Sequence, residues 1–137
     1  ADLLIGFEAA EALRWLPYLR PTGIAMVNTL RIAPPVVSVG LYHYPADPIG
    51  ELMAAGIEVH AFDAGAIAER LGNPKLVNTV MLGAISDHLP FPADVLKECI
   101  VTGFRAYKPK LADSNAQAFD AGREAGHAQT VSRQPEA

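Results

Sequence analysis

The first half of the chain alternates short apolar runs with helical patterns, and this alternation constrains the fold more than any other feature. Three runs, residues 3–7, 24–27 and 57–62, have the length and composition of strands. The segments between them place apolar residues at helical spacing. Strands that alternate with helices are typical of a parallel sheet with crossover helices. Residues 3–7 show no polar alternation, so we expect a fully buried strand there.

Capping and stop residues set the limits of the expected helices. Asp47 and Pro48 supply an N-cap and a first-turn proline, and Gly56 should end that helix. Asp63 should cap a further helix, which residues 72–74 would end.

From residue 74 onward the periodicity is helical only. We expect helices over residues 76–89, from 91 onward and over 111–125. The sequence therefore predicts an α/β protein, a three-layer Rossmann-like parallel sheet with a helical C-terminal half. One domain would cover residues 1–126, with a polar tail over 127–137. Residues 30–45, which contain a proline pair, are expected to form an excursion with an extra strand or hairpin.

Composition excludes several classes of protein. Half of the 137 residues are hydrophobic and 19% are charged, which suits a compact domain rather than a disordered one. The net charge of −4 and the scattered Lys and Arg residues argue against nucleic-acid binding. No apolar run reaches the length of about 18 residues that a membrane span requires. A single cysteine cannot form an internal disulfide, so we expect a cytoplasmic protein.

Polar residues follow all three expected strands. Glu8 follows the first, Asn28 and Thr29 the second, and Asp63 the third. Because the carboxyl ends of parallel strands share one edge, these residues are candidates for a binding or interface site. Glu8 and Asp63 also stand where acidic residues cap helices, which is the structural alternative. The end of a strand does not require an amide side chain. Asn28 and Thr29 therefore point more directly to contact with a ligand or a partner.

Two further asparagines, Asn78 and Asn115, stand on otherwise apolar helices. A buried amide must be hydrogen-bonded, so each is expected to tie its helix to a loop or to the facing helix. Contact with a partner is the alternative for both.

Constellations for catalysis or metal binding are absent from the sequence. The four histidines lack metal-ligand spacing, and one thiol cannot hold an iron–sulfur cluster, which uses about four. Cys99 falls on an apolar stripe with Leu96, Ile100 and Gly103, where it is expected to be a small core residue. There is no GxSxG elbow, phosphate loop or GxGxxG fingerprint. We therefore predict no catalytic residue, no metal and no cofactor in this chain.

Several motifs together resemble a known family. Residues 11–23, EALRWLPYLRPTG, followed by Val27-Asn28-Thr29, are similar to the gamma domain of the pyruvate and indolepyruvate ferredoxin oxidoreductases. The similarity continues in order through the following motifs: Tyr44-Pro45, Asp63-Ala64, Asn78, Met81-Leu82-Gly83-Ala84, Leu89-Pro90, Lys108-Pro109, Asn115, Ala118-Phe119 and Gly122. It covers residues 2–125, and the connection over residues 34–45 is most like the indolepyruvate type. In this family the domain opens with a glycine-rich strand–turn–helix, which we expect to lie upstream of the present sequence.

The resemblance implies an activity for a whole complex. That activity is the oxidative decarboxylation of a 2-oxoacid to acyl-CoA, with coenzyme A and ferredoxin. Thiamine diphosphate and iron–sulfur clusters would be held by a partner subunit. The gamma domain would pack against that partner and help enclose the coenzyme A and substrate region.

Two other functions remain open on the sequence. One is an NAD-dependent Rossmann dehydrogenase whose fingerprint lies upstream of residue 1. The other is a non-catalytic binding protein of the same fold.

Overall fold

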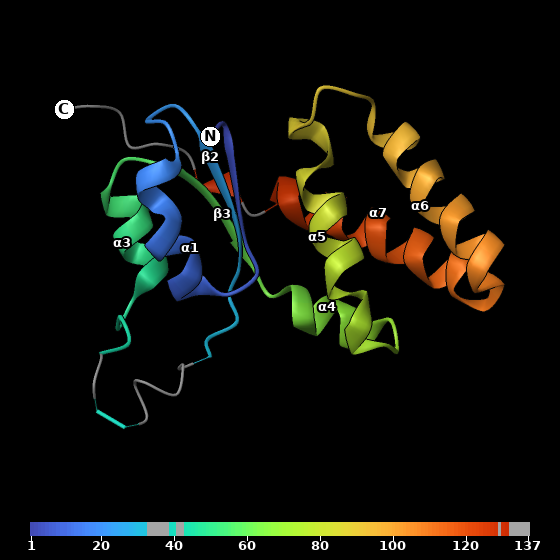
Figure 1. Ribbon diagram of the computed structural model, residues 1–137, viewed down its shortest axis with the longest axis horizontal. Coiled ribbons are helices and arrows are strands. Elements are labelled where there is room, and N and C mark those ends of the chain that lie inside the picture. Colours follow the sequence, from blue (N-terminus) through green and yellow to red (C-terminus); the bar gives the residue numbers. More distant parts are fainter. Residues whose placement is uncertain (33–38, 41–42, 129, 132–137) are drawn as a thin grey trace. The chain divides into compact units, whose positions relative to one another are not determined.

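A computed structural model describes residues 1–32, 39–40, 43–128 and 130–131 (Figure 1). These residues divide into two compact units, of which the first runs to Ala61 and includes the segment from Thr130, and the second starts at Phe62. The expected excursion over residues 30–45 lies largely outside the described residues. That all of residues 1–126 form one domain remains a prediction.

The sheet has the order β1-β2-β3-β4, formed by β1 (Leu3–Gly6), β2 (Ile24–Asn28), β3 (Glu58–Phe62) and β4 (Thr130–Val131). The first three strands are parallel, and the register of β1 and β2 places Leu3 beside Ile24 and Gly6 beside Val27. The α/β, Rossmann-like class is thereby confirmed. β4 pairs antiparallel with β3, although the sequence placed its two residues in a polar tail.

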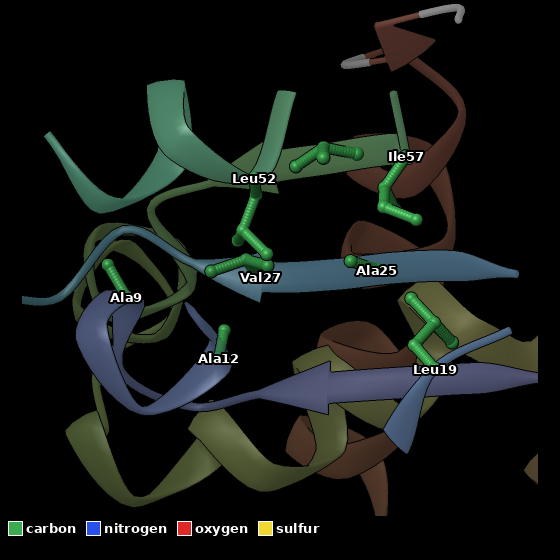
Figure 2. Close-up of a cluster of buried hydrophobic side chains, with 8 residues drawn as sticks. Ala9, Ala12, Leu19, Ala25, Val27, Leu52 and Ile57 are labelled. Atoms are coloured by element: carbon green, nitrogen blue, oxygen red, sulfur yellow. The ribbon is translucent and has the colours of Figure 1, made fainter. Parts of the chain in front are cut away.

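The core of the first unit forms where helices α1 (Ala9–Trp15) and α3 (Pro48–Ala54) pack on one face of the sheet (Figure 2). The 3₁₀ helix η1 (Leu16–Tyr18) extends α1. Asp47 caps α3 by accepting from the Gly50 amide at 2.9 Å, and Gly56 follows the helix at φ 77°. Both ends are as the sequence predicts. The buried cluster consists of Ala9, Ala12, Leu19, Ala25, Val27, Leu52, Ile57 and Val59.

Strand β1 differs from the prediction of a fully buried strand. It lies at the end of the described sheet, Leu3 and Leu4 are half-buried, and Ile5 is 37% exposed. An apolar run of this length fits either a central strand or an edge strand, because the number of neighbouring strands is a tertiary property.

The second unit is helical, as the sequence predicts. Its helices are α4 (Ala64–Arg70), α5 (Val77–Ile85), α6 (Ala93–Tyr107) and α7 (Ala112–Ala128), with 3₁₀ turns η2 (Pro74–Leu76), η3 (Ser86–His88) and η4 (Pro109–Leu111). Gly72, at φ 88°, follows α4 as expected. No helix in the described part of the chain is long and apolar enough to cross a membrane.

Helices α5 and α7 approach each other closely because glycines stand at their contact. A Cβ atom at Gly83 would lie 2.0 Å from the carbonyl oxygen of Phe119, and one at Gly122 would lie 1.9 Å from that of Val80. Real Cβ atoms do not approach so closely, so only glycine fits these two positions at the present helix separation. Phe119 is the largest fully buried side chain of the chain's described part.

The packed face of α6 differs from the expected stripe. Ala93 is buried and Leu96 and Ile100 are half-buried, whereas Cys99 is exposed and Gly103 faces open space. The prediction that Cys99 is a core residue is therefore wrong. The stripe of apolar and small residues on α6 is wider than the surface that one neighbouring helix can bury. The sequence could therefore not show which side of the stripe is packed.

Candidate interface site at the strand ends

The carboxyl ends of β1 and β2 lie side by side, as the predicted site requires. Asn28 is 2% exposed, and its Nδ2 donates to the carbonyl oxygen of Phe7 at 3.1 Å. This hydrogen bond joins the ends of the two strands. Thr29 follows directly and is half-buried. The structure therefore brings Glu8, Asn28 and Thr29 together.

Glu8 caps α1 and also holds the chain that leaves β2. Its Oε2 accepts from the Glu11 amide at 2.8 Å, which confirms the capping interpretation. Its Oε1 accepts from the Ile32 amide at 3.1 Å and from the hydroxyl of Tyr44. A single carboxylate thus connects three separate segments, a role that the sequence did not indicate.

Arg31 strengthens the same connection. Its guanidinium donates to the carbonyl oxygens of Ala46 at 2.9 Å and Pro45 at 3.1 Å, and it lies 5.0 Å from the centre of the Tyr44 ring. Residues on both sides of the excursion are therefore fixed to one another at its base.

Glu8 is held as an anion. Partial burial alone would raise its pKa, but hydrogen bonds from Tyr44 and the backbone amides outweigh this effect and lower the pKa below its ordinary value. Burial and the neighbouring Glu8 carboxylate raise the pKa of Tyr44. A carboxylate whose two oxygens are both occupied by donors is suited to holding structure rather than to moving protons.

We expect Glu8→Gln to lower the free energy of unfolding at neutral pH by about 1 kcal/mol, because charged acceptors form the stronger hydrogen bonds. The folded-state pKa of Glu8 lies below the unfolded-state pKa. The contribution is therefore complete above the unfolded-state value and is lost as the pH falls through the folded-state value. Urea denaturation should show the difference between wild type and variant shrinking below a pH of about 4. Glu124→Gln, on the exposed side of α7, serves as the control at neutral pH.

Exposed apolar side chains surround the strand ends. Phe7 is 45% exposed, Leu30 46% and Ile32 58%. Large apolar side chains gathered beside a fixed polar group are typical of a contact surface. We call this surface the strand-end rim and define it by Phe7, Glu8, Asn28, Thr29, Leu30 and Ile32.

Asp63 belongs to the second unit, where it caps α4. Its Oδ1 accepts from the Ala66 amide at 2.9 Å, so the capping interpretation is confirmed. That Asp63 shares an edge with Glu8 and Asn28 remains a prediction, as does an interface role for each of these residues.

Asn115 joins α7 to α5. Its Oδ1 accepts from the hydroxyl of Thr79 at 2.5 Å, and its Nδ2 donates to the carbonyl oxygen of Leu111 at 2.8 Å. It is 3% exposed, which fits the expected buried and hydrogen-bonded amide. Asn78, in contrast, is exposed, so the prediction of a buried amide is wrong there. The neighbouring Thr79 is buried instead, because it faces α7 across the helix contact.

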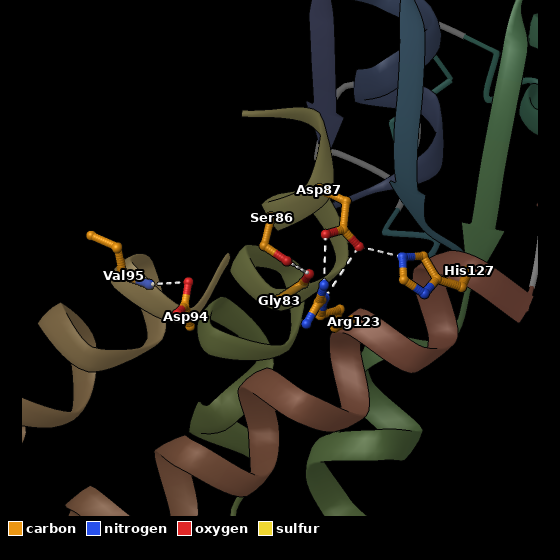
Figure 3. A network of polar contacts seen from close by, with 7 residues as sticks. All are labelled: Gly83, Ser86, Asp87, Asp94, Val95, Arg123 and His127. Atoms are coloured by element: carbon orange, nitrogen blue, oxygen red, sulfur yellow. Dashed lines mark hydrogen bonds and ion pairs between the residues drawn. The ribbon is translucent and has the colours of Figure 1, made fainter. Parts of the chain in front are cut away.

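A second polar network joins η3 to α7 (Figure 3). Asp87 accepts from Nε of Arg123 at 3.1 Å and from a terminal nitrogen of Arg123 at 2.9 Å, and it also contacts Nε2 of His127. Arg123 is the main cause of the lowered pKa of Asp87. The sequence could not indicate this network, because Asp87 and Arg123 are 36 residues apart.

The described residues do not fit a bound metal ion, and the cysteine content of the chain does not fit an iron–sulfur cluster. The chain has one cysteine, whereas a cluster takes about four thiolates. In the described part of the chain, no three residues of the types His, Cys, Asp or Glu gather closely enough to hold a metal. His60 is buried on β3, with Nε2 2.7 Å from Oε1 of Glu58.

Comparisons with known proteins place the chain in a family. Residues 1–125 match the model of the pyruvate ferredoxin/flavodoxin oxidoreductase family. The indolepyruvate oxidoreductase subunit IorB of Thermococcus kodakarensis is 36% identical over 127 residues, covering 89% of this chain and 61% of that protein. The subunit of the same name from Pyrococcus horikoshii gives the same identity and coverage.

The subunit IorB of Archaeoglobus fulgidus is 33% identical over 141 residues, which cover 100% of this chain and 67% of the relative. The chain thus spans about three fifths of the first two relatives and two thirds of the third. The resemblance drawn from the motifs is confirmed, and the chain belongs to the pyruvate ferredoxin/flavodoxin oxidoreductase family.

Proposed function

We propose that this chain is the gamma domain of a 2-oxoacid:ferredoxin oxidoreductase of the indolepyruvate type. The family match over residues 1–125 is the observation that carries this proposal. Relatives named as indolepyruvate oxidoreductase subunits support the choice of substrate class. The chain would act in the cytoplasm as part of a heteromer.

The complete complex would oxidise an aryl pyruvate such as indolepyruvate, or pyruvate itself. The 2-oxoacid would lose carbon dioxide, its acyl group would pass to coenzyme A, and the electrons released would reduce ferredoxin. Thiamine diphosphate stabilises the carbanion in such reactions, and iron–sulfur clusters carry the electrons. The companion subunit would bind both groups: the clusters because this chain supplies one cysteine only, and thiamine diphosphate because the family resemblance implies it.

The contribution of this chain would be a binding surface. The strand-end rim exposes Phe7, Leu30 and Ile32, whose apolar area is available for burial against the companion. Glu8 and Arg31 hold the backbone beneath these side chains in place. A surface that is ordered before association loses less entropy on binding. Docking here would help enclose the coenzyme A and substrate region and exclude water from it.

Co-expression with a thiamine diphosphate-binding subunit of an indolepyruvate oxidoreductase should give a stable complex on size-exclusion chromatography. We expect Phe7→Asp to weaken the complex by about tenfold or more, because it places an unpaired charge in the interface. Met53→Asp changes an equally exposed apolar residue on α3 and should leave the complex intact. If the complex tolerates Phe7→Asp as well as Met53→Asp, the strand-end rim is not the surface that binds the companion subunit.

Activity provides the second part of the test. The purified complex should reduce ferredoxin when supplied with coenzyme A and a 2-oxoacid, and the rates with indolepyruvate and pyruvate would identify the substrate type. The isolated chain should be inactive. Absence of any 2-oxoacid-dependent reduction in the assembled complex would contradict the proposed function.

A further inference from the structure

The turn between α6 and α7 concentrates positive charge on an acidic chain. Arg105, Lys108 and Lys110 lie within six residues that contain no Asp or Glu, whereas the whole chain has a net charge of −4. These three residues are therefore clustered, and the prediction of scattered basic residues is wrong for them. Together with Tyr107 they define a surface that we call the basic turn.

All four side chains of the basic turn are exposed. Tyr107 is 79% exposed, more than any other large hydrophobic side chain in the described part of the chain, and Nζ of Lys108 lies 5.4 Å from the centre of its ring. Among the described residues, no ion pair involves Arg105, Lys108 or Lys110. Four cations elsewhere are paired with carboxylates, namely Arg14, Arg20, Lys97 and Arg123.

The backbone holds the basic turn in a fixed shape. The Lys108 amide donates to the carbonyl oxygen of Phe104 at 2.6 Å, and the Leu111 amide donates to that of Lys108 at 2.9 Å. Pro109 stands in the first turn of η4, where its ring fixes φ. The three cations are therefore displayed on an ordered segment.

Helix electrostatics explain only part of this charge. Arg105 lies in the last turn of α6, where the helix dipole favours a cation. Lys110 lies just before the amino terminus of α7, where the dipole disfavours a cation. No carboxylate of the described residues pairs with Lys110, so an ion pair within the described chain does not account for its charge.

We propose that the basic turn docks an acidic segment of a protein partner, one in which Asp and Glu residues are clustered. Three unpaired cations are complementary to such a segment, and tyrosine and arginine are the residue types that carry binding energy at protein interfaces. A long nucleic acid fits less well, because three cations within six residues match a short run of carboxylates rather than a continuous phosphate backbone. The inference goes beyond the proposed function and does not depend on the identity of the companion subunit.

Fluorescence anisotropy of a labelled polyglutamate peptide, titrated with the full chain, tests this inference. We expect saturable binding that weakens as salt is added, because exposed charges are screened. Lys110→Glu should weaken binding by about fivefold or more, since it removes an attraction and adds a repulsion. The matched control is Lys75→Glu, which reverses an exposed lysine on η2. Tyr107→Ala should weaken binding without changing its salt dependence.

Three results would overturn the inference. The first is equal affinity for the wild type and Lys110→Glu, and the second is an equal loss for Lys75→Glu. The third is a labelled single-stranded DNA that binds the turn more tightly than polyglutamate at the same salt concentration. Far-UV circular dichroism of each variant establishes that a lost affinity does not reflect unfolding. Since these measurements use the chain alone, they are independent of whether the oxidoreductase complex assembles.

Discussion

Gly122→Ala should lower the free energy of unfolding of the helical unit by about 2–4 kcal/mol, as expected when atoms are forced into a packed contact. The added Cβ would lie 1.9 Å from the carbonyl oxygen of Val80, which belongs to the backbone of α5 and cannot rotate away. The two helices would therefore have to separate. Alanine is otherwise a better helix former than glycine by about 1 kcal/mol, so intrinsic helix propensity alone predicts that the substitution raises the free energy of unfolding.

Urea denaturation followed by far-UV circular dichroism measures this effect. Gly103→Ala is the matched control, because Gly103 also stands within a helix but a Cβ there meets no atom within 4 Å. We expect that substitution to stabilise the chain by about 0.5–1 kcal/mol. If Gly122→Ala also stabilised the chain, the close contact of α5 and α7 would be refuted. Gly83→Ala, whose Cβ would meet the Phe119 carbonyl, should repeat the loss from the other helix.

Asn115→Ala should cost about 2–4 kcal/mol, since it removes one buried and one partly buried hydrogen bond and leaves a buried hydroxyl without its partner. The hydroxyl is that of Thr79, which is 5% exposed and donates to Asn115 at 2.5 Å. The carbonyl oxygen of Leu111 also loses the donor at 2.8 Å. The same denaturation experiment measures the loss.

A double-mutant cycle separates the hydrogen bond from packing. Thr79→Val combined with Asn115→Leu should cost less than the sum of the single changes, because neither buried partner is then left unpaired. Asn78→Ala is the control on the same helix and should change stability by less than about 0.5 kcal/mol, because Asn78 is exposed. Strict additivity of Thr79→Val and Asn115→Leu would show that the two side chains do not interact.

Local patterns account for much of the agreement between sequence and structure. The helix starts at Glu8, Asp47 and Asp63 were predictable because a capping carboxylate bonds to an amide only three residues away. The helix ends at Gly56 and Gly72 were predictable because glycine tolerates positive φ. The three parallel strands followed from the alternation of apolar runs with helical segments.

The strand-end rim was predictable only in part. Parallel strands bring their carboxyl ends together, so the proximity of Glu8, Asn28 and Thr29 followed from the fold class. The hydrogen bonds from Ile32 and Tyr44 to Glu8 could not be predicted from the fold class. These residues lie 24 and 36 positions after Glu8 in the chain, and no periodic pattern links residues at such separations. Arg31 was missed for the same reason.

By itself, the sequence determined the α/β class, the capped helices and the family, since each depends on residues near one another along the chain or on the order of motifs. Only the tertiary structure decided that β1 lies at the end of the described sheet, that Cys99 and Asn78 face outward, and that Thr79 is buried. The physical reason is common to these cases. Burial depends on which neighbour covers a side chain, and that neighbour comes from a distant part of the chain.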